Sequence, residues 1–156
     1  MELFIKMDIA KEVQEMYLPE WRFLKSFGRD GNVFQGSFNV PFSPYLKDRK
    51  KINHLSEVEF DACLSQLCYS SIASLFEEGR FGSSKDLLDF LTIQGDGVLT
   101  GISNKKFRKS ISHGKFDGEI VLQNYLSKNS FSELIYSGNF ADGSIVIDPF
   151  TVEVIR

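Results

Sequence analysis

The sequence has few of the residues that form cross-links or bind metals. Among its 156 residues are only two cysteines and two histidines. So small a supply of thiol and imidazole groups argues against a zinc or iron centre. Cys63 and Cys68 fall on different faces of one expected helix, so we expect them to stay reduced and buried rather than paired. Reduced, buried thiols are typical of a cytoplasmic protein.

Long apolar runs and an excess of positive charge are also missing. No stretch is apolar for long enough to span a membrane. Residues 1–16 include acidic side chains and lack the apolar segment of a signal peptide. The net charge of −3 argues against general nucleic-acid binding, which needs a basic surface. We therefore expect a cytoplasmic protein with no membrane span and no nucleic-acid partner.

The signatures of several enzyme classes are absent as well. The chain has no nucleophile elbow, no Gly-rich phosphate loop and no cluster of histidine and cysteine ligands. The run QGDG at 94–97 lacks the lysine and hydroxyl residue of a phosphate loop, so we interpret it as a turn. We expect no metal and no resident cofactor.

Phenylalanine, in contrast, is abundant, with 15 residues in the chain. Hydrophobic residues make up 42% of the sequence and charged residues 25%, which is ordinary for a globular protein. The length suffices for one domain with a sizeable core, so we expect residues 1–156 to form a single domain. The surplus of aromatic surface fits a core, a partner interface or a lipid pocket, and composition leaves these three open.

The strongest local signal is one long helix. Ser56 followed by Glu59 has the spacing of a capping box, which marks a helix start. Gly79 is a natural helix end, because glycine adopts the left-handed conformation past the last turn. Between them we predict a buried helix over about 57–78. Its apolar stripe consists of Phe60, Cys63, Leu64, Leu67, Cys68, Ile72, Leu75 and Phe76.

The remaining segments predict strands, with two shorter helices. A helix is expected over 5–17 and another over 84–90, and a glycine-containing turn at 28–31 precedes a strand at 32–40. This order predicts an α+β fold, in which an antiparallel sheet wraps around one long central helix. Five further strands are expected over 97–103, 106–112, 117–126, 131–139 and 144–154.

Two segments resemble a known family. Residues 38–69 read FNVPFSPYLKDRKKINHLSEVEFDACLSQLCY. A Ser-x-Tyr segment leads through an Asn-bearing turn into the central helix, which has a Val-Glu-Phe start and a Gln-x-x-Tyr step. In these features the chain resembles the FcoT-like thioesterase family. Residues 106–114, KFRKSISHG, look like the basic strand and glycine turn of hot-dog thioesterases and dehydratases.

The resemblance covers roughly residues 33–145 and implies a hot-dog fold. It also implies a homodimer or a higher even oligomer, with acyl chains bound beside the central helix at the subunit interface. The implied substrates are fatty acyl thioesters of coenzyme A or of an acyl carrier protein, so the phosphopantetheine arm belongs to the substrate. Hydrolysis by a thioesterase is the first expectation.

Two other functions stay open at this point. Relatives in the same group appear to add glycine across an enoyl thioester on the way to isonitrile lipids, and other hot-dog enzymes dehydrate hydroxyacyl thioesters or hydrate enoyl ones. The family also tends to have an asparagine on the helix where this chain has Asp61 or Ser65. This difference keeps open a non-catalytic, acyl-binding subunit.

A polar ribbon on the central helix is the first candidate site. Asp61, Ser65 and Tyr69 follow each other at steps of four residues, so they share one helix face. Gln66 lies alongside. Because residues 60–76 contain neither lysine nor glutamate, this face does not look like an ordinary solvent face. We expect Asp61, Ser65 and Gln66 to orient water or an amine.

Two residues before the helix are candidates for holding the thioester carbonyl. Tyr45 has a phenol that can donate a hydrogen bond to a developing oxyanion, and Asn53 can position the carbonyl or water. Their alternative roles are a tyrosine that closes the end of a strand and an ordinary turn residue.

The two histidines have different expected roles. His54 together with Asp61 or Glu59 would form the acid–base pair of a dehydratase, although the sequence pattern around the dehydratase histidine is absent. The alternative for His54 is a loop residue. His113 lies in a predicted turn, and we expect it to be structural.

Basic residues gather in two runs, 47–51 and 105–115. In the second run, Lys106, Arg108 and Lys109 are our candidates for binding the phosphates of coenzyme A or of phosphopantetheine, or an acidic carrier protein. The alternative is two solvated surface runs.

Overall fold

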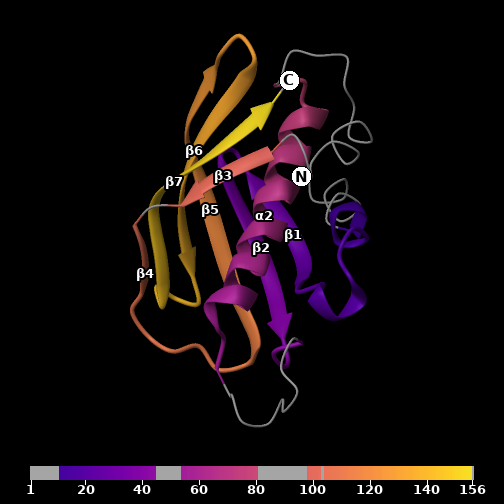
Figure 1. The fold of residues 1–156 in the computed structure, drawn as a ribbon, viewed down its shortest axis with the longest axis vertical. Helices are drawn as coiled ribbons and strands as arrows, with labels where there is room; N and C mark the ends of the chain where they lie inside the picture. Colours follow the sequence, from indigo (N-terminus) through magenta and orange to yellow (C-terminus); the bar gives the residue numbers. More distant parts are fainter. Residues whose placement is uncertain (1–10, 45–53, 81–97, 103, 156) are drawn as a thin grey trace.

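The structure, a computed structural model, describes residues 11–44, 54–80, 98–102 and 104–155 (Figure 1). Within this part of the chain, no helix is both long and apolar enough to cross a membrane. The elements in chain order are η1 (Pro19–Trp21), β1 (Leu24–Asp30), β2 (Val33–Val40), α2 (Glu57–Glu77), β3 (Val98–Ile102), β4 (Lys105–Phe107), β5 (Gly114–Ser127), β6 (Phe131–Phe140) and β7 (Ile145–Ile155).

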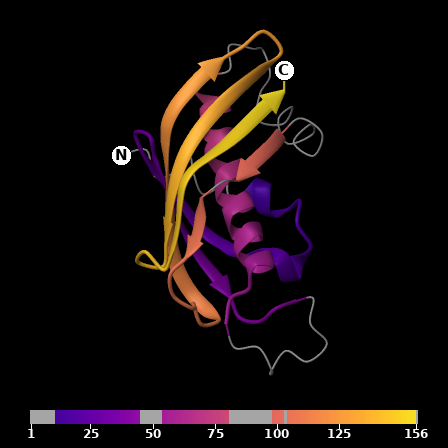
Figure 2. The ribbon, with the colours of Figure 1, turned by 60° about the vertical axis from the view of Figure 1, so that its left-hand side comes forward.

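The strands form one seven-stranded sheet in the order β1-β2-β5-β6-β7-β3, and β4 also pairs with β7. All the recorded pairs are antiparallel. Figures 1 and 2 show α2 lying against one face of this curved sheet. The predicted α+β fold, an antiparallel sheet around one long helix, is confirmed.

The helix α2 has nearly the predicted bounds. It ends two residues before Gly79, whose φ of 72° is the left-handed conformation expected there. Ser56 is the N-cap residue, but its side chain makes no capping hydrogen bond. The predicted capping box is therefore wrong. Glu59 instead turns its carboxylate into the protein, where it is fully buried.

Alternation along the strands decides which side chains face α2. In β2 the buried positions are Phe34, Gly36, Phe38 and Val40, and the residues between them are more exposed. Gly36 pairs with Gly118 of β5. A Cβ atom at Gly36 would lie 2.7 Å from Leu24 Cδ1, and one at Gly118 would lie 2.1 Å from Phe140 Cδ1. Both positions therefore require glycine, because neighbouring side chains occupy the space of a Cβ.

Three predicted elements differ from the structure. The turn expected at 28–31 is shorter, because residues 28–30 continue β1 and Asp30 pairs directly with Val33. The strand expected over 106–112 ends at Phe107 as β4. The helix expected over 5–17 is helical at 11–14 in its described part, and the helix expected over 84–90 lies outside the described residues.

Both cysteines are free and buried, as predicted. Burial raises the pKa of the Cys68 thiol to about 12. Burial also raises the pKa of Cys63 well above its ordinary value, and the nearby Glu59 carboxylate raises it further. Both side chains are therefore neutral thiols at physiological pH, and neither resembles an activated nucleophile.

Candidate active site

A buried polar cluster lies at the start of α2. Ser43 Oγ donates a hydrogen bond to Glu59 Oε1. His113 Nε2 lies 3.3 Å from Ser43 Oγ and 3.6 Å from Glu59 Oε1. Ser43 and Glu59 are fully buried, and the His113 side chain is 7% exposed. A carboxylate, a hydroxyl and an imidazole thus meet in one place.

The sheet brings these three side chains together from distant parts of the sequence. Val40, the last residue of β2, pairs with Gly114, the first residue of β5. Ser43 follows β2 and His113 precedes β5, so both lie at the same end of this strand pair. The segment that leads into α2 is fixed there too, because His54 forms an isolated bridge with Ser112.

The position of Glu59 favours a charged carboxylate. It lies in the first turn of α2, where free backbone N–H groups and the helix dipole stabilise negative charge. A buried carboxylate also needs hydrogen bonds to offset its lost hydration, and Ser43 supplies one. A carboxylate in this setting can accept a proton, and His113 beside it can donate one.

A pocket of about 310 Å³ opens at the same end of the molecule. It brings together three predicted residues, His54, Arg108 and Lys109, whereas Lys106 is not part of its lining. Leu55 in its wall donates a backbone hydrogen bond of 2.7 Å to the carbonyl of Ile111. The full lining is His54, Leu55, Phe107, Arg108, Lys109, Ser110, Ile111 and Ile145.

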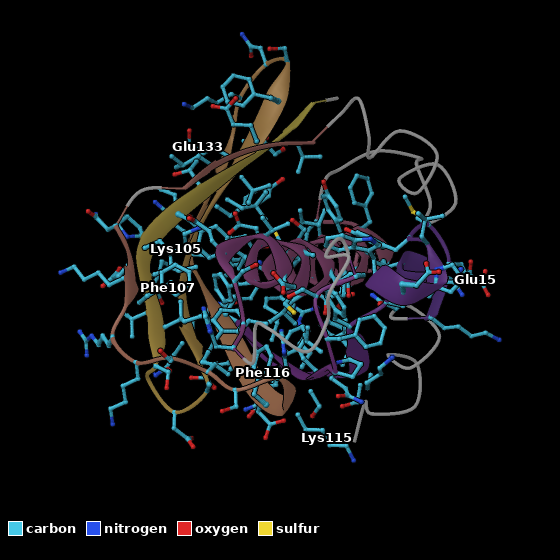
Figure 3. All side chains as sticks on the ribbon, turned by 60° about the horizontal axis from the view of Figure 1, so that its bottom comes forward. Glu15, Lys105, Phe107, Lys115, Phe116 and Glu133 are labelled. Atoms are coloured by element: carbon cyan, nitrogen blue, oxygen red, sulfur yellow. The ribbon has the colours of Figure 1, made fainter. Side chains whose placement is uncertain are left out.

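Asp61 belongs to a separate ion-pair group on the outside of α2. Lys105 Nζ lies 2.7 Å from Asp61 Oδ1 and 2.6 Å from Glu57 Oε1. The ammonium also lies 5.8 Å from the ring centre of Phe60 and 5.6 Å from that of Phe107. Figure 3 shows Lys105 and Phe107 on the same side of α2. Asp61 is 44% exposed, and it ties β4 to the helix.

Gln66 is fully buried and connects α2 to the segment before β1. Its Oε1 accepts hydrogen bonds of 3.0 Å from the backbone N–H groups of Phe23 and Leu24. Its Nε2 donates one of 2.6 Å to the carbonyl of Trp21. These bonds use the amide to hold the chain. A part in catalysis, predicted from the sequence, stays an untested prediction.

The other predicted site residues are not in contact with the Glu59 cluster, or they lie outside the described residues. Ser65 is half-buried on α2. Tyr69 is also half-buried, and burial raises the pKa of its phenol. Tyr45 and Asn53 lie outside the described residues, so their predicted contacts with a thioester carbonyl stay predictions.

A family model for the FcoT-like thioesterase domain matches residues 12–142 of the chain. The chain belongs to the FcoT-like thioesterase family. This confirms the resemblance expected from residues 38–69. No curated protein matches the sequence.

Two solved structures show the fold of this FcoT-like chain. One is a putative thioesterase, a phenylacetic acid degradation-related protein from Ralstonia eutropha, with a TM-score of 0.53 and 10% identity over 95% of this chain and 98% of that one. The other is the dehydratase heterocomplex ApeI:P from Xenorhabdus doucetiae, with a TM-score of 0.51 and 10% identity over 94% and 90%. The expected hot-dog fold is confirmed.

Sequence reasoning missed two members of the cluster in this FcoT-like domain. His113 was expected to be structural, and Ser43 was noted only as part of the Ser-x-Tyr segment. The weak signal in the sequence is that both flank strands that pair with each other, β2 and β5. Glu59 was assigned to a capping box, a role that hid its position inside the protein.

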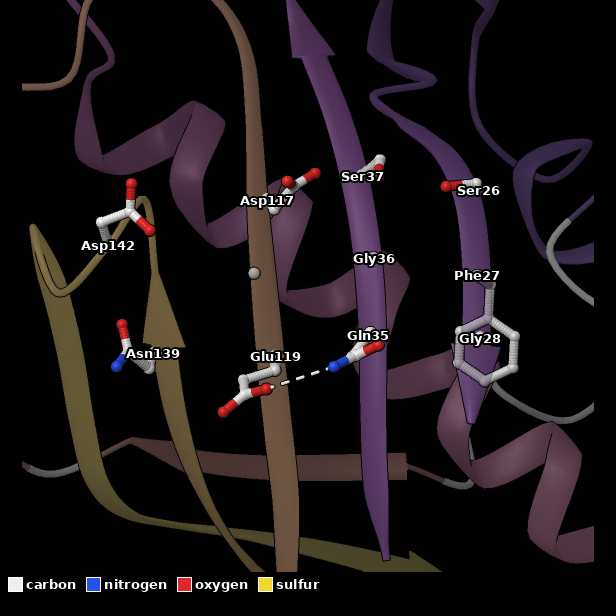
Figure 4. A pocket seen from close by; sticks show the side chains of 11 residues that line it. Ser26, Phe27, Gly28, Gln35, Gly36, Ser37, Asp117, Glu119, Asn139 and Asp142 are labelled. Carbon is white, nitrogen blue, oxygen red and sulfur yellow. Dashed lines mark hydrogen bonds between the residues drawn. The ribbon is translucent and has the colours of Figure 1, made fainter. Parts of the chain in front are cut away.

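The largest hollow in the described part of the domain lies on the other side of the sheet. It measures about 760 Å³ and is lined mainly by polar side chains of β1, β2, β5 and β6 (Figure 4). Gln35 Nε2 lies 3.5 Å from Glu119 Oε2 across its floor. These residues alternate with the buried ones that face α2, so this hollow is separated from the Glu59 cluster by the sheet.

Metal ligands are not clustered in residues 11–44, 54–80, 98–102 and 104–155. No group of three or more histidine, cysteine, aspartate or glutamate side chains there has the arrangement to hold a metal ion. The chemistry of the described site therefore has to be derived from its carboxylate, hydroxyl and imidazole groups.

Proposed function

We propose that this FcoT-like protein hydrolyses acyl thioesters of coenzyme A or of an acyl carrier protein, with Glu59 as the base that activates water. The observation that supports this most strongly is the buried Glu59 carboxylate, held by Ser43 and lying 3.6 Å from His113. A general base of this kind contributes about 10²- to 10⁴-fold to a rate.

The proposed reaction needs no resident cofactor. Glu59 takes a proton from water, and the oxygen of that water attacks the thioester carbon. The C–S bond then breaks, and the thiolate that leaves takes a proton from Glu59 or His113. The products are a free acid and a free thiol. The N–H groups at the start of α2, with Tyr45 and Asn53 as predicted partners, are the donors we assign to the oxyanion.

The pocket beside the cluster supports a place for the thiol half of the substrate. Arg108 and Lys109 line it together with His54. Guanidinium and ammonium groups bind phosphate oxygens by charge-assisted hydrogen bonds. We assign these cations, with Lys106 next to them, to the phosphates of coenzyme A or of a phosphopantetheine arm.

We further propose that the protein acts as a cytoplasmic homodimer. Among the described strands, β3 pairs only with β7, so its other edge is available for a second copy. The two reduced, buried cysteines are consistent with the cytoplasm.

One observation favours a second candidate, the dehydration of hydroxyacyl thioesters or the hydration of enoyl ones. Hot-dog dehydratases use a histidine with an acidic residue as acid and base, and Glu59 lies next to a histidine. That histidine is His113, whereas His54, the residue expected from the sequence, is exposed at the edge of the pocket. In this reaction no C–S bond breaks, so no thiol is released.

The experiment is turnover of saturated, 3-hydroxyacyl and 2-enoyl thioesters on both carriers, following free thiol and acyl product with and without glycine. The variant Glu59→Gln tests the proposed base. Glu57→Gln is the matched control, because it is the same change at an exposed carboxylate in the same helical turn. Thiol release that falls at least a hundredfold in Glu59→Gln, but not in Glu57→Gln, supports the thioesterase.

The other outcomes contradict the thioesterase and separate its rivals. Enoyl or hydroxyacyl substrate consumed without thiol release identifies the dehydratase or hydratase. Enoyl consumption that requires glycine identifies glycine addition. Binding of every thioester without turnover of any identifies a non-catalytic acyl-binding subunit.

A further inference from the structure

Gln14 has a buried side-chain amide with no hydrogen-bond partner. Both its Nε2 and its Oε1 are shielded from solvent, and the residue is only 8% exposed. An amide buried without partners costs about 1–3 kcal/mol, so such groups are rare in folded proteins. An uncompensated cost of this kind is expected where a side chain waits for a ligand.

Two tyrosines lie near this amide. Tyr17 follows Gln14 by one turn, and its backbone N–H donates a 3.0 Å hydrogen bond to the Gln14 carbonyl. Burial raises the pKa of the Tyr17 phenol, and Tyr69 and Cys68 of α2 raise it further. The Tyr17 hydroxyl therefore lies close to this turn of the helix.

The backbone holds these groups in place. Gln66, one turn before Tyr69, binds the chain at residues 21–24 and so fixes the N-terminal segment along α2. Figures 1 and 2 both show this segment beside the middle of the helix. Arg22 reinforces the turn, because its Nε donates a 2.9 Å hydrogen bond to the Tyr17 carbonyl.

We propose that Gln14, Tyr17 and Tyr69 bind a neutral hydrogen-bonding group, a hydroxyl or carbonyl, on the acyl chain of the substrate. This inference rests on the proposed function, because it assumes that the acyl chain extends along α2 from Glu59. The preferred substrates are then thioesters of acyl chains with an oxygen substituent, and plain saturated chains are poorer ones.

The chemistry of the site selects an uncharged group. An amide and two phenols offer donors and acceptors without charge. A buried ion would need an opposite charge to offset its desolvation. Since burial raises the pKa of both phenols, they stay protonated and neutral at physiological pH.

The distance along the helix limits where the substituent lies on the chain. Glu59 and Tyr69 are separated by ten residues, which at 1.5 Å per residue corresponds to roughly 15 Å along α2. The thioester carbon reacts near Glu59, so the oxygen substituent lies far down a long acyl chain. Substituents close to the thioester do not reach this site.

The experiment compares long-chain acyl thioesters that have one hydroxyl at successive positions, with the unsubstituted chain as reference. We expect one position far from the thioester to raise kcat/KM about five- to tenfold, the value of one or two hydrogen bonds. Gln14→Leu and Tyr69→Phe should reduce this ratio to about one. Glu12→Gln, an exposed neighbour on the same segment, should preserve it.

Three outcomes would overturn the inference: no preferred position, a preference confined to positions next to the thioester, or a preference that survives in Gln14→Leu. Failure of the proposed function is separable. If no thioester is hydrolysed, the affinities of the matching free hydroxy acid and plain acid are compared in wild type and Gln14→Leu. A five- to tenfold preference lost in the variant supports the site even then, and equal affinities in wild type overturn it.

Discussion

Replacing Gln66 by leucine tests whether the amide is a structural tie. In the protein it accepts hydrogen bonds from the N–H groups of Phe23 and Leu24 and donates one to the carbonyl of Trp21. Phe23 N and Trp21 O also lie 3.1 Å from each other, so these two groups keep a partner. The N–H of Leu24 loses the acceptor that Gln66 provides.

The structure gives an approximate magnitude for this loss. One orphaned buried N–H costs about 1–3 kcal/mol, and the weakening of the other two bonds adds about 1 kcal/mol, for a total of about 2–4 kcal/mol. For a domain of this length, that lowers the Tm by roughly 4–16 °C. Urea denaturation followed by circular dichroism measures the free energy of unfolding directly.

A matched control is available on the outer face of the sheet. Gln35 is exposed, and its one recorded side-chain bond, to Glu119, is 3.5 Å long. We expect Gln35→Leu to change stability by less than about 0.5 kcal/mol. If Gln66→Leu is as stable as this control, the hydrogen bonds do not hold the chain, and the reasoning is refuted. If Gln66→Leu remains folded but inactive, the catalytic role predicted from the sequence gains support.

Three further predictions concern packing and ionisation. Gly118→Ala should destabilise the fold by more than about 2 kcal/mol in urea denaturation, because its Cβ would overlap the Phe140 ring, whereas Gly28→Ala meets nothing within 4 Å and should cost less than about 1 kcal/mol. Alkylation of Cys63 and Cys68 at neutral pH should follow the unfolding rate, since burial holds both as neutral thiols; rapid labelling of the native protein would contradict this. Burial also raises the pKa of Tyr136 well above its ordinary value. Because the unfolded phenol ionises above about pH 10 and the folded one does not, stability should be constant below that pH and fall above it, and denaturation at a series of pH values checks this.

The sequence predicts the long elements of this fold well. The helix α2 and the strands β2, β5, β6 and β7 have strong periodicity, and their bounds agree with the structure within a few residues. The strand β1 was missed because Gly28 lies in it, and a glycine next to Gly31 looks like part of a turn. Glycine here allows the strand to continue to Asp30, and only Gly31 adopts a positive φ.

The site was less predictable, because its parts meet through strand pairing between distant residues. Ser43 and His113 are far apart in the sequence, and no local pattern indicates that β2 and β5 are neighbours. Glu59 has the spacing of a cap and also that of an inward-facing residue, and the sequence cannot distinguish them. The same limit applies to the basic run, where Lys105 binds acidic residues on α2 while Arg108 and Lys109 line the pocket.

The facing glycines of β2 and β5 have a consequence for how the enzyme assembles. A slip of one residue in this strand pair would turn Gln35 or Ser37 toward α2, where Leu24 and Leu67 leave no room at Gly36 for even a Cβ. Misregistered pairings are thereby excluded during folding. Two positions without side chains thus determine how Ser43 and His113 are aligned, and the catalytic groups are preorganised before any substrate binds.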